Sequence, residues 1–154
     1  MDSPLVHTDL NGFFLEDLSV GMSGVFAKTI TEADIVLFSG VTGDMNPVHV
    51  NQEYAQDTMF KGRIAHGMLT ASLISTVLGM KMPGPGVIYL GQDLKFLAPV
   101  RAGDTVTARA VITDIIPEKK RIICKTTASV GEKLVCDGTA KMMVRSRAEL
   151  DEKS

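Results

Sequence analysis

The sequence predicts an α+β domain in which an antiparallel sheet is wrapped around one long buried helix. Three observations lead to this fold class. Residues 67–86 contain the longest mostly apolar stretch of the chain, residues 87–144 divide into four strand-like segments, and short turns connect these segments. Strands that follow one another through short turns run antiparallel, and a helix packed on the sheet covers their apolar face.

The segment before the long helix predicts one strand and two short helices. Residues 20–30 carry enough β-branched and aromatic side chains for a first strand. Thr31 is placed to cap a helix, and Asp34 three residues later gives a weaker form of the capping box. A second short helix is expected to start at Asn51. The buried face of the first helix is expected to carry Ile35, Phe38 and Val41.

The long helix and the strands after it account for the expected core. Residues 67–86 show no strongly charged face before Lys81, which is typical of a helix packed on most sides, and the Pro-Gly-Pro-Gly run at 83–86 ends the helix. Along 105–116, the side chains that share one face are Val106, Ala108, Ala110 and Ile112. Along the last strand, the residues that share one face are Leu134, Cys136, Gly138, Ala140, Met142 and Val144. The edge of such a sheet is exposed, so pairing with a second copy is expected.

Length and composition exclude several classes of protein. The 154 residues suit one domain, 1–154, with loose polar ends at about 1–12 and 147–154. The net charge is −2 and no basic stripe is present, which argues against nucleic acid or a membrane surface as a partner. The two cysteines have no metal-ligand spacing and are expected to be small buried thiols. With no secretory signal and no apolar run of about 20 residues, a cytoplasmic protein is expected.

The segment TGDMNPVHVN, residues 42–51, carries the first candidate site. Asp44 and His49 are separated by an Asn-Pro turn that can bring both side chains toward one point. Because an unperturbed Asp has a pKa of about 3.9 and a His of about 6.5, such a pair can accept and return a proton near neutral pH. The alternative is that Asp44 caps a turn and His49 is a surface histidine.

The start of the long helix carries the second candidate site. His66 and Gly67 stand at its N-terminus, where unpaired backbone N–H groups favour negative charge. Gly67 has no side chain, so another group can approach its amide closely, and a developing enolate oxygen would be stabilised there. The alternative is that Gly67 is a plain loop-to-helix junction and that His66 packs against it. Ser75 lies two turns further along, in a helix otherwise rich in apolar residues, and is a further candidate. Its alternative is a hydroxyl bonded back to the preceding turn.

Three stretches resemble the MaoC-like (R)-specific enoyl-CoA hydratases: FSGVTGDMNPVHVNQEYA, FKGRIAHGMLTASLIS and GPGVIYLGQDLKFLAPVRAGDTV. The resemblance runs from about residue 15 to residue 145, and a D-x-N-P-x-H element followed by I-A-H-G-M-L is its most specific part. It implies a hot-dog fold, an antiparallel β-sheet wrapped around a long central α-helix, and a homodimer. It also implies the reversible syn hydration of a trans-2-enoyl-CoA to an (R)-3-hydroxyacyl-CoA, with an acyl-CoA partner and no metal or redox cofactor.

The resemblance also implies roles for individual residues. Asp44 and His49 match the catalytic dyad, and Asn46 and Gly67 match positions that hold the dyad and the thioester carbonyl, Gly67 through its backbone amide. Ser75 matches a position that hydrogen-bonds within the dyad network of short single-domain members. Further candidates for contact with the substrate are His66, Met68 and Leu78. A core role is the alternative for Leu78, and filling of the core is the alternative for Met68.

Other activities remain open at this point. A 3-hydroxyacyl-acyl-carrier-protein dehydratase would run the same chemistry on a protein-tethered chain. A hot-dog acyl-CoA thioesterase would bind the same ligands without needing the Asp-x-Asn-Pro-x-His segment, and a non-catalytic acyl-CoA-binding subunit would need no intact dyad. The sequence leaves open the chain length, the dyad member that first takes the proton, and the pathway, including fatty acid oxidation and polyhydroxyalkanoate synthesis.

Overall fold

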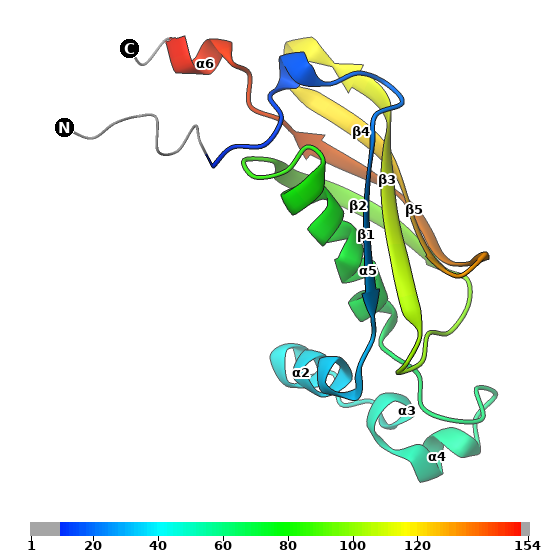
Figure 1. Cartoon of the computed structure of the whole chain (residues 1–154). Helices are drawn as coiled ribbons and strands as arrows, with labels where there is room; N and C mark the ends of the chain where they lie inside the picture. The colour runs from blue at the N-terminus through cyan, green and yellow to red at the C-terminus, as the bar shows by residue number, and fades with distance from the viewer. Residues whose placement is uncertain (1–9, 152–154) are drawn as a thin grey trace.

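Five antiparallel strands form one sheet in the order β1-β3-β4-β5-β2, and a central helix lies against one face of it (Figure 1). The structure is a computed structural model that describes residues 10–151. The strands are β1 (Ser23–Thr29), β2 (Ile88–Phe96), β3 (Thr105–Ile116), β4 (Arg121–Val130) and β5 (Lys133–Met143). The predicted α+β class, with one strand before the helix and four after it, is therefore confirmed.

The central helix is α5 (Gly67–Thr76), and a π-helical turn, η2 (Val77–Lys81), continues it. Its apolar side chains enter the hydrophobic core against β1, β3 and β4. The helical segment ends at Lys81, before the Pro-Gly run that the sequence marks as its end. Gly84, with φ 87°, has the left-handed backbone that lets the chain turn there.

The first helix, α2 (Glu32–Thr42), begins as predicted. Thr31 Oγ1 accepts a hydrogen bond of 3.1 Å from the Asp34 amide, and Asp34 Oδ2 accepts one of 2.9 Å from the Thr31 amide. The predicted buried face is only partly correct, because Ile35 is buried and Phe38 half-buried but Val41 is 85% exposed. Val41 lies six residues after Ile35, which turns it away at about 3.6 residues per turn. The second fully buried position is Ser39, at i+4 from Ile35.

Two very short helices follow, α3 (Pro47–Val50) and α4 (Gln52–Gln56). The expected helix at Asn51 is α4, and Asn51 is its N-cap, with its Oδ1 accepting from the Tyr54 amide at 3.0 Å. The turn α3 is an addition to the prediction. It begins at Pro47, whose fixed φ suits the first position of a helix.

The predicted core faces of the strands are correct along β3 and fail at one end of β5. Along β3, the four side chains expected to face the core are buried. In β5, Leu134 is 38% exposed whereas Val135 is buried. The register explains this difference: Ala128 pairs with Cys136 but Ser129 pairs with Leu134, so an extra residue in β5 reverses the alternation at that point.

The described parts of the two chain ends pack together. Arg147 forms an ion pair with Asp17 of the short helix η1 (Leu15–Asp17), with 2.9 Å between Nη1 and Oδ1. Residues Ala148–Asp151 form α6, and its Glu149 pairs with Lys120, which follows η3 (Pro117–Lys119). These charged pairs give residues 147–151 contacts with the rest of the chain, and the expectation of loose ends at about 1–12 and 147–154 stays a prediction. The expected loose segments at 1–9 and 152–154 lie outside the described residues.

Both cysteines are unpaired thiols inside the sheet, as expected. Burial raises the pKa of the Cys124 thiol to about 12, and burial also raises that of Cys136. Within residues 10–151, none of the helices has the length and hydropathy needed to cross a membrane.

Candidate active site

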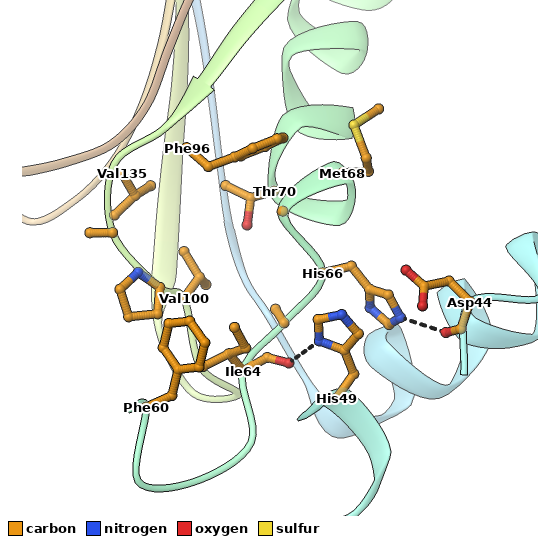
Figure 2. Close-up of a pocket in the computed structure, with 14 residues that line it drawn as sticks. Asp44, His49, Phe60, Ile64, His66, Met68, Thr70, Phe96, Val100 and Val135 are labelled. Carbon is orange, nitrogen blue, oxygen red and sulfur yellow. Dashed lines mark hydrogen bonds between the residues drawn. The ribbon is translucent and has the colours of Figure 1, made fainter. Parts of the chain in front are cut away.

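A cavity of about 340 Å³ opens at the N-terminal end of α5, and the two candidate sites meet there (Figure 2). Its polar end holds Asp44, His49 and His66, and Figure 2 shows these three side chains grouped together. The residues that line the rest of the cavity are mostly apolar: Phe60, Ile64, Ala65, Gly67, Met68, Thr70, Phe96, Ala98, Pro99, Val100 and Val135. The cavity thus joins an end that carries titratable side chains to an apolar interior.

The turn after α2 places Asp44 beside His49. Gly43, with φ 78°, is the C-cap of α2 and reverses the chain in the left-handed conformation. Asp44 Oδ1 then accepts from the Asn46 amide at 3.2 Å, and Asn46 Oδ1 accepts from the Val48 amide at 3.3 Å. The Asn46 carbonyl accepts from the His49 amide at 2.9 Å. The backbone of Asn46 is therefore hydrogen-bonded to both members of the predicted pair, and its supporting role in the reaction stays a prediction.

His49 is held in one defined orientation. The side chain is 7% exposed, and its Nδ1 lies 2.8 Å from the carbonyl oxygen of Ile64. A carbonyl oxygen can only accept, so Nδ1 carries the hydrogen. In the neutral ring, Nε2 is then the free acceptor, which is the arrangement that a general base needs.

His66 links the pair to the helices on either side. It is 2% exposed and its ring stacks on that of His49, with 3.9 Å between the ring centroids. Its Nε2 lies 3.0 Å from the Asp44 carbonyl oxygen and 3.1 Å from Ser39 Oγ. Because the carbonyl only accepts, His66 Nε2 is the donor to Asp44. The structure thus places His66 as a support of the Asp44 turn as well as a lining residue of the cavity.

Gly67 supplies a backbone amide at the cavity. It is the first residue of α5, so its N–H has no carbonyl partner within the helix, and the helix dipole adds positive potential there. A methyl carbon on Gly67 would lie 2.9 Å from ring atoms Cδ1 and Cε1 of Phe96. A side chain at this position would therefore force the Phe96 ring to shift, whereas glycine lets the ring lie against the start of α5.

Arginine side chains hold the loop that carries the lining residues Phe60 and Ile64. Arg101 donates to the carbonyl oxygens of Phe60 and Arg63, the latter at 3.2 Å. Arg63 forms an ion pair with Glu32, with 2.8 Å between Nη2 and Oε1, and also donates to the His49 carbonyl at 3.4 Å. Both guanidinium groups are therefore engaged in holding this loop in place.

Asp44, His49 and His66 are also the one set of three described residues that could share a metal ion. Their candidate ligand atoms lie within 4.8 Å of one another. Two of the four imidazole nitrogens already face carbonyl oxygens, which leaves His49 Nε2 and His66 Nδ1 for a metal. The expectation that no metal takes part stays a prediction.

Two of the predicted site residues lie apart from the pair. Ser75 is exposed and lines a second cavity of about 500 Å³ between α5 and β2, with Tyr89 and Gln92. It lies eight residues beyond Gly67, about 12 Å along a helix axis, so in the described chain it does not join the network of Asp44 and His49. Leu78 is fully buried in the core and lines neither cavity, in agreement with its alternative role.

Met68 and two unpredicted residues complete the description of the site. Met68 is exposed and lines both cavities, as a substrate contact would. Sequence reasoning missed Ser39 and Thr70, which are buried polar side chains near His66 and Gly67. A polar residue at i+4 from Ile35 on the buried face of a helix was the available signal for Ser39. A threonine inside a mostly apolar helix was the signal for Thr70.

Comparison with known proteins gives relatives over almost the whole chain. Residues 20–134 match a family described as MaoC like domain. An (R)-specific enoyl-CoA hydratase of Rhodospirillum rubrum is 55% identical over 139 residues, covering 90% of this chain and 96% of that protein. A 3-hydroxybutyryl-CoA dehydratase of Methylorubrum extorquens is 44% identical over 143 residues, covering 93% of this chain and 91% of that protein.

Solved structures give the same result for the fold. The R-hydratase PhaJ1 from Pseudomonas aeruginosa, in its unliganded form, superposes with a TM-score of 0.83 at 40% identity, covering 90% of this chain and 89% of that one. The (R)-hydratase from A. caviae superposes with a TM-score of 0.81 at 37% identity, covering 84% of this chain and 98% of that one. The hot-dog fold expected from the sequence is confirmed by these similarities.

Proposed function

The chain belongs to the MaoC-like domain family, and from this premise we propose that it is an (R)-specific enoyl-CoA hydratase. It is a hydro-lyase that adds water reversibly to a trans-2-enoyl-CoA and yields the (R)-3-hydroxyacyl-CoA. The observation that carries the proposal is the placement of an acceptor nitrogen, His49 Nε2, beside the Asp44 carboxylate and the first amide of α5 in one apolar cavity. We propose further that the reaction uses no metal or redox cofactor.

Asp44 and His49 hold the attacking water between them in this mechanism. His49 Nε2 and the carboxylate oxygens of Asp44 are acceptors for its two hydrogens, so its lone pair faces the β-carbon of the substrate. As the carbon–oxygen bond forms, the π electrons move toward the thioester oxygen and the dyad takes the proton. The same dyad then returns a proton to the α-carbon on the same face, which gives syn addition.

The Gly67 amide stabilises the enolate-like thioester oxygen while charge develops there. Removing one such donor typically costs about 2.7–4 kcal/mol of activation free energy. The neighbouring positive end of the α5 dipole acts in the same direction. The acyl chain lies along the apolar wall formed by Phe96, Val100 and Val135.

The assay that tests the activity follows the hydration of crotonyl-CoA and the configuration of its product. We expect the enoyl absorbance to fall and an (R)-specific 3-hydroxyacyl-CoA consumer to pull the reaction forward. Release of free thiol instead would identify a thioesterase. Faster turnover on the crotonyl thioester of a carrier protein would identify a carrier-protein dehydratase, and tight binding of crotonyl-CoA with no turnover would identify a binding subunit.

We propose that two copies associate through the edge strand β2. This strand is the last in the sheet order, so one side of its backbone is unpaired, and it exposes the apolar side chains of Ile88 and Leu90. The second cavity, which contains Ser75, lies between this strand and α5, so a partner copy would close it. The two unpaired cysteine thiols fit a reducing compartment, and we propose the cytoplasm.

Leu90→Glu is expected to shift the protein from dimer to monomer. A charge on each copy at a shared apolar edge would be buried against its counterpart, which is unfavourable. Light scattering after size-exclusion chromatography should then give a mass near 16.6 kDa. The matched control is Val25→Glu, an exposed apolar residue of β1 at the opposite edge. A monomeric wild type, or a control that dissociates as Leu90→Glu does, would contradict this arrangement.

His66 is expected to act on the rate through the Asp44 turn. His66→Gln keeps an amide donor within reach of the Asp44 carbonyl, whereas His66→Phe keeps a ring beside His49 but has no donor. Because a small displacement of a reacting group can reduce the rate by about 100-fold, His66→Phe should lower kcat to that extent with little change in KM. His66→Gln should stay within a few-fold of the wild type. Equal losses of kcat in both variants would show that the ring stacking, and not the donor, matters.

A further inference from the structure

Thr70 has a hydroxyl group that the protein leaves unpaired in a buried place. The residue is 2% exposed, and among residues 10–151 its Oγ1 has no hydrogen-bond partner. A helical threonine commonly bonds its hydroxyl to the carbonyl four residues earlier. Here that residue is His66, whose carbonyl accepts from the amides of Leu69 at 3.0 Å and of Thr70 at 3.3 Å. Buried polar groups are nearly always paired, so this hydroxyl calls for a partner.

The cavity offers a place for that partner. Thr70 is one of its lining residues, and Figure 2 shows the Thr70 oxygen directed into the cavity, away from Phe96. Val100 and Val135 also line the cavity, and their side chains offer no hydrogen-bonding atom. A polar atom of whatever fills the cavity is therefore the natural partner.

Helix geometry brings Thr70 close to Gly67. Residues three apart lie on the same face of a helix, and side chains lean toward the N-terminus. The Thr70 hydroxyl therefore stands over the first turn of α5, where the Gly67 amide is unpaired within the helix. Both residues line the same cavity, so one bound molecule can contact both.

We propose that the Thr70 hydroxyl donates a hydrogen bond to the thioester oxygen of the bound enoyl-CoA, beside the Gly67 amide. The inference rests on the proposed hydratase function and adds a side-chain donor to the oxyanion site. When the oxygen of water bonds to the β-carbon, the π pair shifts to give an enolate whose negative charge resides on that oxygen. Both donors hold the charge until the α-carbon takes the proton and the carbonyl is restored. Thr70 remains protonated throughout, and water is the sole reactant added.

The kinetic test compares Thr70→Val with Thr70→Ser. Valine has the shape of threonine without the hydroxyl, whereas serine keeps the hydroxyl and loses only the methyl group. Since one oxyanion donor contributes about 100- to 1,000-fold to kcat, kcat of Thr70→Val on crotonyl-CoA should fall by about 100-fold, with a smaller change in KM. Thr70→Ser should stay within a few-fold. Thr70→Ala is the second hydroxyl-free variant, should valine disturb folding.

A spectroscopic arm separates hydrogen bonding from packing. Butyryl-CoA labelled with ¹³C at the thioester carbonyl binds without reacting, and its carbonyl stretch moves to lower frequency when the oxygen accepts a hydrogen bond. We expect this shift to be smaller in Thr70→Val than in the wild type and retained in Thr70→Ser. An unchanged stretch in both hydroxyl-free variants overturns the inference, even where kcat falls.

The two hypotheses fail in different ways. If the wild type hydrates crotonyl-CoA and Thr70→Val does so at the same rate, the inference is wrong and the hydratase function stands. If the wild type binds butyryl-CoA but hydrates no enoyl-CoA, the proposed function is wrong. The carbonyl stretch then still reports whether Thr70 contacts the thioester.

Discussion

Asp44→Asn is expected to fold normally and to lose nearly all hydration of crotonyl-CoA. Asparagine keeps the side-chain oxygen that accepts from the Asn46 amide, so the turn should persist. It cannot take a proton from water, and a positioned acid–base group contributes about 100- to 10,000-fold to the rate. Initial rates should show kcat reduced within that range and KM nearly unchanged, because the apolar wall is untouched.

His49→Gln should cause a loss of the same order. Glutamine can still donate to the Ile64 carbonyl, but its remaining oxygen is a far weaker base than the imidazole nitrogen. Asp57→Asn, at the C-cap of α4 and outside the cavity, is a matched control that should turn over normally. Circular dichroism and the melting temperature check that all variants are folded. Wild-type-like turnover in Asp44→Asn or His49→Gln would refute the assignment of the pair.

Leu78→Ala is expected to lower stability and leave the chain-length preference unchanged. The side chain is fully buried in the core and touches neither cavity. Truncating a buried leucine to alanine typically lowers the free energy of unfolding by about 2–5 kcal/mol. Urea denaturation measures this loss, and kcat/KM on enoyl-CoA thioesters of increasing length should give the same profile as the wild type.

The control for this variant is Leu37→Ala, whose leucine is exposed on α2. Its free energy of unfolding should change by no more than about 0.5 kcal/mol, as is usual for surface substitutions. A variant of Leu78 with wild-type stability and new activity on longer chains would instead assign this residue to the acyl site.

The fold could be predicted because its main elements each leave a strong local signal. The alternation along β3 and the apolar run of α5 are long enough for their period to be recognised. Leu134 was misplaced because a one-residue shift in pairing depends on β4, which the local pattern of β5 does not contain. Val41 was misplaced because three apolar residues allow more than one buried face on a short helix, and the tertiary contacts favour the face that includes Ser39.

The site could be predicted only where its residues stand together in one short motif. Gly43 and Asn46 position Asp44 and His49 through local turn and cap geometry, and such geometry is encoded by neighbouring residues. The contact of Ser39 with His66 spans 27 residues, so no local pattern records it. Ser75 was assigned by resemblance alone, and its cavity beside β2 depends on how that strand packs against α5.

The contact between Gly67 and Phe96 makes the two positions interdependent in directed evolution. A side chain at 67 would collide with the ring at 96, so the ring would have to shift, and this ring lines the cavity where the acyl chain is proposed to lie. A library that varies position 67 alone should therefore contain almost no active clones. Pairing alanine at 67 with a smaller residue at 96 should recover some of them, and those clones would carry a reshaped acyl site.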